Sequence, residues 1–169
     1  MNAFFDSNVV VYAHDRRDTR KQSRAIDLLA VHADDGTLTI STQVLAETYS
    51  ILLRKRLLKP EDALTALEAL AVGRVVPADT ASVMRGLLLS RRYQLSSWDG
   101  LIVQAALDAG CTTLFTEDLQ AGQRFGDLEV VNPFDDAVHA PRAAWPAPAA
   151  KKSTRRAVAK PAAKRAAKR

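Results

Sequence analysis

Two hydrophobic patterns alternate along the chain. Short unbroken apolar runs are separated by longer segments in which apolar residues recur every three or four positions. The short runs predict strands and the longer segments predict amphipathic helices. We expect strands at 3–6, 38–40, 74–76, 112–115 and 128–131, and helices at 8–14, 18–33, 43–57, 60–70, 80–93 and 96–110.

The predicted strands lack the period-two alternation of a sheet that has one face in water. Continuous apolar strands that alternate with helices are typical of a parallel sheet covered on both faces. The expected fold class is therefore α/β: a three-layer α/β/α sandwich around a short, mainly parallel central sheet. The 169 residues suit one domain of ordinary size.

The composition changes near Ala140. We expect a folded domain at 1–136, a Pro/Ala-rich linker at 137–149, and a Lys/Arg/Ala-rich tail at 150–169 that is disordered in isolation. The tail carries nine Lys or Arg and no acid, whereas residues 1–149 carry 15 basic and 19 acidic residues. The net charge of +5 therefore combines an acidic body with a strongly basic tail.

A single cysteine excludes an internal disulfide and fits a reducing compartment, so we expect a cytoplasmic protein. No apolar run approaches the ~20 residues that a membrane helix needs, and no membrane association is expected.

Four acidic residues fall near the carboxyl ends of predicted strands or in the first turns of the helices that follow. They are Asp6, Glu47, Asp99 and Asp118. In an open parallel sheet, functional sites form at this edge. Each acid except Glu47 also has an ordinary structural interpretation: Asp6 as a helix cap, Asp99 as part of a capping box with Ser96, and Asp118 as a turn residue.

Glu47 is harder to explain as a surface residue. Val44 and Ile51 lie three residues before it and four after it, so we expect its carboxylate to face inward. Converging carboxylates repel one another unless a divalent cation neutralises them. Oxygen ligands without Cys or His favour Mg²⁺ or Mn²⁺, which can activate water for attack on a phosphodiester.

Four segments in this order resemble the PIN-domain ribonucleases, and within them the VapC toxins of toxin–antitoxin pairs: FFDSNVVVYA, TQVLAETYSIL, SSWDGLIVQAAL, and TLFTEDLQAGQRF with LEVVNPF. The resemblance spans about residues 2–134. It implies a Mg²⁺- or Mn²⁺-dependent endoribonuclease, a hydrolase that forms homodimers and is inhibited by a cognate antitoxin protein. It leaves the basic tail unexplained, and Gly100 stands where the family has alanine.

The resemblance also implies roles for single residues. Asp6 and Asp99 would bind the metal directly, Glu47 and Asp118 would act through water, and all four would be catalytic. Asn8 and Thr116 fall on supporting polar positions, and Glu117 is taken as a bystander. For RNA binding, we consider basic residues after Asp6 and in the tail: Arg16, Arg17, Arg20, Lys151, Lys152, Arg155 and Arg156.

Three rival interpretations remain. A phosphotransferase of the haloacid dehalogenase type also starts with a strand and an Asp, but it needs a second Asp where this chain has Asn8. A response-regulator receiver needs an early acid pair and a late Lys that we do not find. A non-catalytic protein that binds nucleic acid through its basic tail is the alternative outside enzymes.

Overall fold

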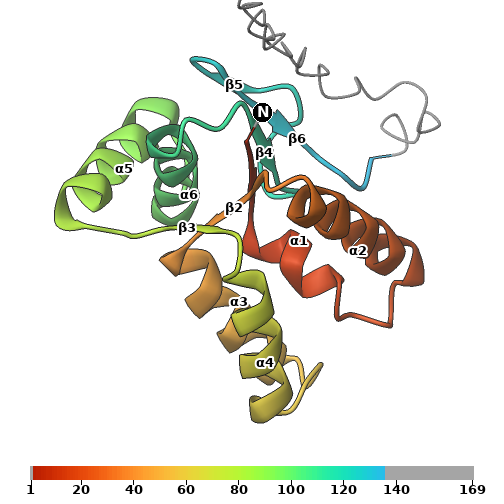
Figure 1. Ribbon diagram of the computed structural model, residues 1–169. Helices are drawn as coiled ribbons and strands as arrows, with labels where there is room; N and C mark the ends of the chain where they lie inside the picture. Colours follow the sequence, from red (N-terminus) through yellow and green to blue (C-terminus); the bar gives the residue numbers. More distant parts are fainter. Residues whose placement is uncertain (1, 136–169) are drawn as a thin grey trace, which may run out of the picture.

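The computed structural model describes residues 2–135, which form an α/β domain around one six-stranded sheet. Its strands are β1 (Ala3–Phe5), β2 (Leu38–Ser41), β3 (Arg74–Val76), β4 (Thr113–Phe115), β5 (Arg124–Phe125) and β6 (Leu128–Val131). They lie in the order β3-β2-β1-β4-β6-β5 (Figure 1). All neighbouring strands are parallel except the β5–β6 pair. The prediction of a mainly parallel sheet is confirmed.

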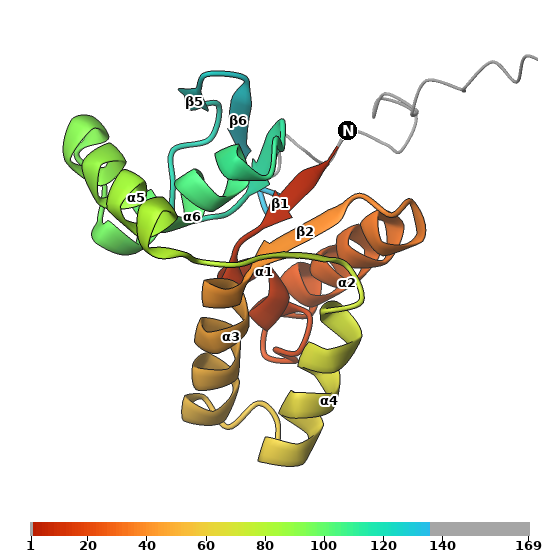
Figure 2. The same cartoon turned by 60° about the vertical axis from the view of Figure 1, so that its left-hand side comes forward.

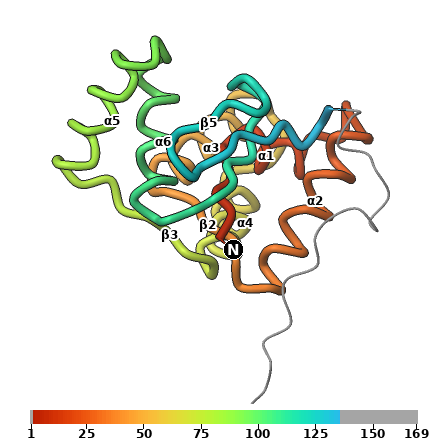
Figure 3. The backbone as a smooth tube through the Cα atoms, turned by 90° about the horizontal axis from the view of Figure 1, so that it is seen from above, coloured from red at the N-terminus to blue at the C-terminus, as the bar shows by residue number. Residues whose placement is uncertain are grey.

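Six helices surround this sheet: α1 (Ser7–Tyr12), α2 (Thr19–Asp34), α3 (Thr42–Arg54), α4 (Pro60–Leu70), α5 (Thr80–Tyr93) and α6 (Ser97–Asp108). The α1–α2 pair lies on one side of the sheet and the α5–α6 pair on the other (Figures 1 and 2). The same division is seen from above in Figure 3. The α3–α4 pair extends from the edge where β1 and β2 end. The three-layer expectation is therefore confirmed.

Apolar side chains on both sides of the central strands form the core. Phe4, Phe5, Ile40, Leu114 and Phe115 are almost fully buried. The strand register pairs Phe5 with Phe115, so β1 and β4 end side by side. The backbone N–H of Asp6 then donates to the carbonyl of Phe115 at 3.1 Å. This register places Asp6 and Thr116 next to each other at one edge of the sheet.

Two local features differ from the sequence-based expectations. The strand β5 was not predicted, because it has two residues and is formed by antiparallel pairing with β6. Helix α3 ends at Arg54 rather than at residue 57. Arg56 adopts a positive φ of 55°, and the N–H of Leu57 donates to the carbonyl of Leu52, as in a Schellman motif. Glycine usually marks this ending, and its absence hid the helix end in the sequence.

Helices α5 and α6 pack unusually closely, which explains Gly100. A Cβ atom at residue 100 would lie 2.5 Å from the carbonyl oxygen of Gly86 and 2.6 Å from Cβ of Ser90. The glycine that lowers helix propensity in α6 is therefore required by the contact with α5. It fixes the position of the helix whose first turn carries Asp99.

The predicted linker at 137–149 and the predicted tail at 150–169 lie outside the described residues. Within residues 2–135, none of the helices combines the length and the apolar character needed to cross a membrane.

Candidate active site

Asp6 is the buried centre of a polar cluster at the carboxyl end of β1. It caps helix α1, since its Oδ1 accepts the backbone N–H of Ser7 at 2.6 Å. Its Oδ2 accepts the hydroxyl of Thr116 at 2.7 Å and the amide of Asn8 at 3.2 Å. The residue is only 6% exposed. The cap and the site are thus two roles of one carboxylate, not alternatives.

Asn8 connects three oxygen atoms of this cluster. Besides Asp6, its Nδ2 atom lies 3.0 Å from the hydroxyl of Thr116 and 3.0 Å from Oδ2 of Asp118. The amide has two hydrogens for these three acceptors. Its Oδ1 atom is buried and has no hydrogen-bond partner. Asn8 therefore brings Asp118 to Asp6 and leaves a further oxygen without a donor.

Glu47 approaches the cluster from α3. Its Oε2 accepts the hydroxyl of Ser7 at 3.1 Å, and its Oε1 accepts the side-chain amide of Gln43 at 2.7 Å. The residue is half-buried, in line with the expected inward orientation. Ser7 and Gln43 were not singled out from the sequence. Their positions, directly after Asp6 and one helical turn before Glu47, are the signals that could have identified them.

Asp99 lies in the first turn of α6, where Ser96 caps the helix as expected but the reciprocal bond of a capping box, from the Ser96 backbone N–H, is replaced by one from its hydroxyl. The backbone N–H of Asp99 donates to Oγ of Ser96, and that hydroxyl donates to Oδ2 of Asp99 at 2.7 Å. Asp99 is linked to the other acids only indirectly, through Gln43. The Nε2 atom of Gln43 donates to Glu47 and also lies 3.5 Å from the backbone carbonyl oxygen of Trp98, the residue before Asp99. The structure thus joins Asp6, Glu47 and Asp118 closely and places Asp99 at the edge of the cluster.

The pKa of Asp6 is raised from 3.8 to about 6. Burial is the main cause, since it disfavours the charged form. Hydrogen bonds from Thr116 and Ser7 act in the opposite direction, and the charges of Asp118 and Glu47 raise the pKa further. A positive charge close to Asp6 would therefore stabilise its ionised carboxylate.

The donor set fits a hard divalent cation. The side chains that meet in the cluster offer carboxylate, hydroxyl and amide groups. Two features call for positive charge: the buried carboxylate of Asp6 and the buried, unpartnered Oδ1 of Asn8. Mg²⁺ and Mn²⁺ prefer such oxygen ligands. As placed in residues 2–135, no three His, Cys, Asp or Glu side chains surround a common point closely enough to hold a metal ion.

The basic residues after Asp6 are not equivalent. Arg17 forms two hydrogen bonds with the carboxylate of Asp15, at 2.7 and 2.5 Å. Arg16 and Arg20 are exposed. Lys21, in the same stretch, pairs with Glu117 at 2.5 Å. The tail residues Lys151, Lys152, Arg155 and Arg156 lie outside the described part of the chain.

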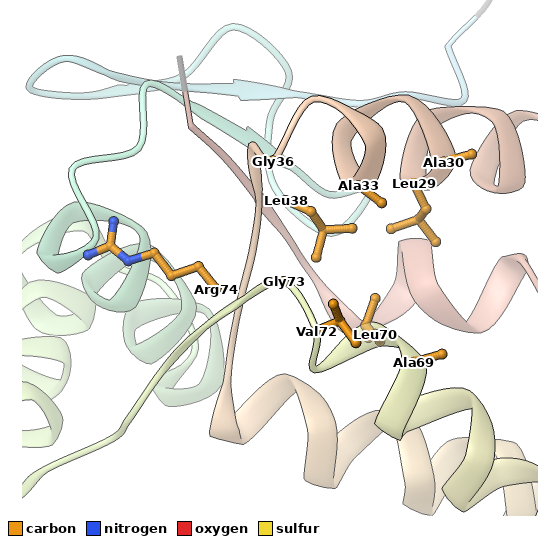
Figure 4. Close-up of a pocket in the computed structure, with 10 residues that line it drawn as sticks. All are labelled: Leu29, Ala30, Ala33, Gly36, Leu38, Ala69, Leu70, Val72, Gly73 and Arg74. Atoms are coloured by element: carbon orange, nitrogen blue, oxygen red, sulfur yellow. The ribbon is translucent and has the colours of Figure 1, made fainter.

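An apolar cavity of about 710 Å³ is lined by residues that include none of the four acids; Figure 4 shows its lining. It is formed by the second half of α2, the start of β2 and the segment from α4 to β3, and its lining includes Leu29, Leu38, Leu70 and Val72. Since Leu38 begins β2, the cavity lies toward the amino ends of the strands, at the opposite edge from Asp6. It contains none of the predicted site residues.

The domain is thus an α/β protein whose mainly parallel sheet carries a cluster of carboxylate, hydroxyl and amide side chains at its carboxyl edge. The family model of the PIN domain matches residues 3–124. The chain therefore belongs to the PIN-domain family. Fold, acidic cluster and family together class it as a nuclease-type hydrolase.

Two solved structures share this fold. VapC20 of Mycobacterium tuberculosis, described as a toxin that cleaves the sarcin–ricin loop, is 18% identical with a TM-score of 0.55, and the match covers 67% of this chain and 87% of that one. VapBC2 from Rickettsia felis, bound to a DNA fragment from its promoter, is 21% identical with a TM-score of 0.57, covering 77% and 97%. No curated protein sequence matches the chain.

Proposed function

We propose that this chain is a metal-dependent endoribonuclease of the VapC type, which hydrolyses RNA phosphodiester bonds. The observation that carries the proposal is the buried carboxylate of Asp6 with its raised pKa, held beside Glu47 and Asp118 in a cluster that has more acceptors than donors. A structural cap alone needs neither the second and third acid nor burial. Family membership supports the same chemistry.

In this proposal, Asp6 and Asp99 bind Mg²⁺ or Mn²⁺ directly, and Glu47 and Asp118 act through bound water. When bound, the metal supplies a water of lowered pKa and neutralises charge on the phosphodiester. Thr116 and Asn8 orient the carboxylates of Asp6 and Asp118 through the hydrogen bonds described above. These bonds hold Asp6 and Asp118 beside each other, but a shared metal ion would require the carboxylates to draw closer, since no three of them surround a common point within residues 2–135.

We further propose that the chain acts as a toxin controlled by a protein partner. The support is the fold shared with VapC20, described as a toxin, and with the VapBC2 complex. A cognate antitoxin and a homodimer are the partners expected from the family resemblance. Copurification of the chain with the product of an adjacent gene, and loss of RNase activity in that complex, would test the antitoxin.

The basic tail is proposed to increase the affinity for RNA without contributing to specificity. Its charge favours contact with phosphates, which is independent of sequence. The described chain ends beside the site: Phe134 packs edge-on against Tyr12, with ring centroids 4.9 Å apart, and Lys21 lies 5.2 Å from the Phe134 ring. Exposed Arg16 and Arg20 are the proposed RNA contacts within the domain.

The decisive experiment compares metal-dependent RNA cleavage by the wild type, Asp6→Asn and Asp99→Asn, with Asp127→Asn as a control at an exposed turn acid. We expect cleavage to be lost in EDTA and in both site variants, but retained in the control. Full activity in purified Asp6→Asn would refute the site. RNA binding without cleavage by the wild type, abolished by removing residues 150–169, would instead favour the non-catalytic alternative.

A further inference from the structure

Lys21 lies at the centre of a compact set of contacts just outside the acid cluster. Its ammonium group is 2.5 Å from Oε2 of Glu117 and 3.0 Å from the hydroxyl of Tyr12. It also lies 4.3 Å from the centroid of the Tyr12 ring and 5.2 Å from that of Phe134. The side chains of Lys21 and Glu117 are only 21% and 23% exposed. Such a shielded pair is held more firmly than a surface salt bridge.

The loop held by this pair carries a proposed catalytic acid. Glu117 turns toward Lys21, whereas its neighbour Asp118 turns toward Asn8, which lies 3.0 Å from its Oδ2. The backbone N–H of Asp118 donates to Oγ of Thr116 at 3.1 Å. The three consecutive residues after β4 are thus fastened at three points: to Asp6, to Lys21 and to Asn8.

The ion pair also has an electrostatic effect. Asp6, Glu47 and Asp118 already place several negative charges close together. Glu117, as a neighbour of Asp118, would add another. The ammonium group of Lys21, 2.5 Å from Oε2 of Glu117, compensates this charge. Without Lys21, a partly buried carboxylate would lose its partner and repel Asp118.

We propose that Lys21 and Glu117 are positioning residues, whose ion pair on the Tyr12 and Phe134 rings sets the place of Asp118 in the acid cluster. This inference rests on the proposed nuclease function. It gives Glu117 a role that the sequence did not suggest, and it assigns Lys21 to the architecture of the site and not to RNA binding. Lys21 acts through Glu117 and does not touch the reacting atoms.

The test uses four variants of the full chain: Lys21→Met, Lys21→Arg, Glu117→Gln and the double variant Lys21→Met/Glu117→Gln. Arg124→Met is the matched control, because it breaks the Arg124–Glu129 ion pair between β5 and β6. For each variant we would measure kcat, KM for RNA, the Mg²⁺ concentration that gives half-maximal activity, and the melting temperature.

For Lys21→Met we expect kcat to fall about tenfold, as for a displaced catalytic group, with an unchanged KM and a higher Mg²⁺ requirement. Lys21→Arg keeps the charge and the ring contact, so it should retain activity within about twofold. The double variant should be no worse than Lys21→Met, because the two residues act as a unit. Arg124→Met should leave all kinetic values unchanged.

Two results would overturn the proposal. One is a lower melting temperature of Lys21→Met with kcat and Mg²⁺ requirement equal to those of the control. The other is a raised KM with unchanged kcat, which would make Lys21 an RNA contact. Should the wild type show no RNase activity, hydrogen exchange at the Asp118 amide separates the questions: faster exchange in Lys21→Met than in Arg124→Met supports the clamp, and equal exchange rejects it.

Discussion

Replacement of Asp6 by Asn is expected to stabilise the metal-free protein while it abolishes activity. The carboxylate of Asp6 is 6% exposed and close to the charges of Asp118 and Glu47. Its ionised form therefore costs free energy in the absence of a cation. Asparagine is uncharged, has nearly the same shape and caps helices as well as aspartate does. The substitution removes the charge and keeps the cap of α1.

The magnitude follows from the pKa of Asp6. A rise from 3.8 to about 6 corresponds to roughly 3 kcal/mol of lost stability above pH 6, at 1.36 kcal/mol per unit. Part of this will not be recovered, because an amide nitrogen at residue 6 would face a hydrogen-bond donor, Nδ2 of Asn8, now 3.2 Å from Oδ2. An unsatisfied hydrogen-bonding group costs on the order of 1–2 kcal/mol, which is subtracted from the full value of roughly 3 kcal/mol. We therefore expect the free energy of unfolding of Asp6→Asn to exceed that of the wild type by about 1–2 kcal/mol.

The pH dependence has a definite sign. The folded state binds the Asp6 proton more tightly than the unfolded state does, since the folded pKa is the higher one. Stability from this group is complete below pH 3.8 and is lost as the pH rises through about 6. Asp6→Asn has no carboxyl group at this position, so its stability does not fall in this pH range for this reason. The difference between Asp6→Asn and wild type should therefore grow from pH 4 to pH 6 and stay constant above.

Chemical denaturation in EDTA at pH 4.5 and pH 7.5, repeated with saturating Mg²⁺, measures these quantities. Mg²⁺ should stabilise the wild type by about 2.7 kcal/mol at a hundredfold excess over its Kd. Mg²⁺ should stabilise Asp6→Asn much less, so that the wild type becomes the more stable of the two proteins when Mg²⁺ is present. Asp79→Asn is the control, because Asp79 caps α5 at the exposed surface. It should show no gain in EDTA.

A lower stability of Asp6→Asn than of the wild type in EDTA at pH 7.5 would contradict the electrostatic cost assigned to the Asp6 carboxylate. Equal stabilisation of both proteins by Mg²⁺ would refute the metal site separately. Since neither result depends on RNA cleavage, the experiment tests the electrostatics of the cluster even where the substrate is unknown.

Three further outcomes are expected. Gly100→Ala should destabilise the fold by about 1–2 kcal/mol despite its better helix propensity, because the clash at 2.5 Å is with backbone. Thermal melting should show a smaller loss for Gly86→Ala, whose nearest contact, at 2.8 Å, is a flexible leucine side chain and whose backbone contacts are longer, at 3.0 and 3.1 Å. Asn8→Ala should lower the free energy of unfolding by about 1–3 kcal/mol in urea titrations and abolish cleavage, since Asp118 loses its donor. Removal of residues 150–169 should raise KM for RNA at low salt with unchanged kcat, and equal KM values across a salt series would contradict a role of the tail.

The architecture could be predicted because its signals are local. Continuous apolar runs separated by helical periodicity specify strands, helices and a parallel sheet, and Asp79 and Ser96 mark helix starts where the structure has them. The two predictions that were wrong, the end of α3 and the missed strand β5, also have local causes. The end of α3 depends on Arg56 in a conformation that glycine usually adopts, and β5 exists only through its pairing with β6.

The site could be predicted only in part. Strand order brings Asp6 and Asp118 to one edge, and the sequence contains enough information for that. The direction of each carboxylate depends on partners that are distant in sequence, such as Ser7 for Glu47 and Lys21 for Glu117. Gly100 illustrates the same limit, because its role depends on Gly86 in a neighbouring helix.

The strand order also has a consequence for how the protein is made. The first strand of the chain, β1, lies between β2 and β4, so its second neighbour arrives more than a hundred residues later. The bond from Thr116 to Asp6 spans 110 positions. Contacts of such long range form late and slowly. During synthesis on the ribosome, the first three strands can assemble while Asp6 still lacks Thr116 and Asp118. The complete acid cluster therefore forms only when β4 inserts beside β1.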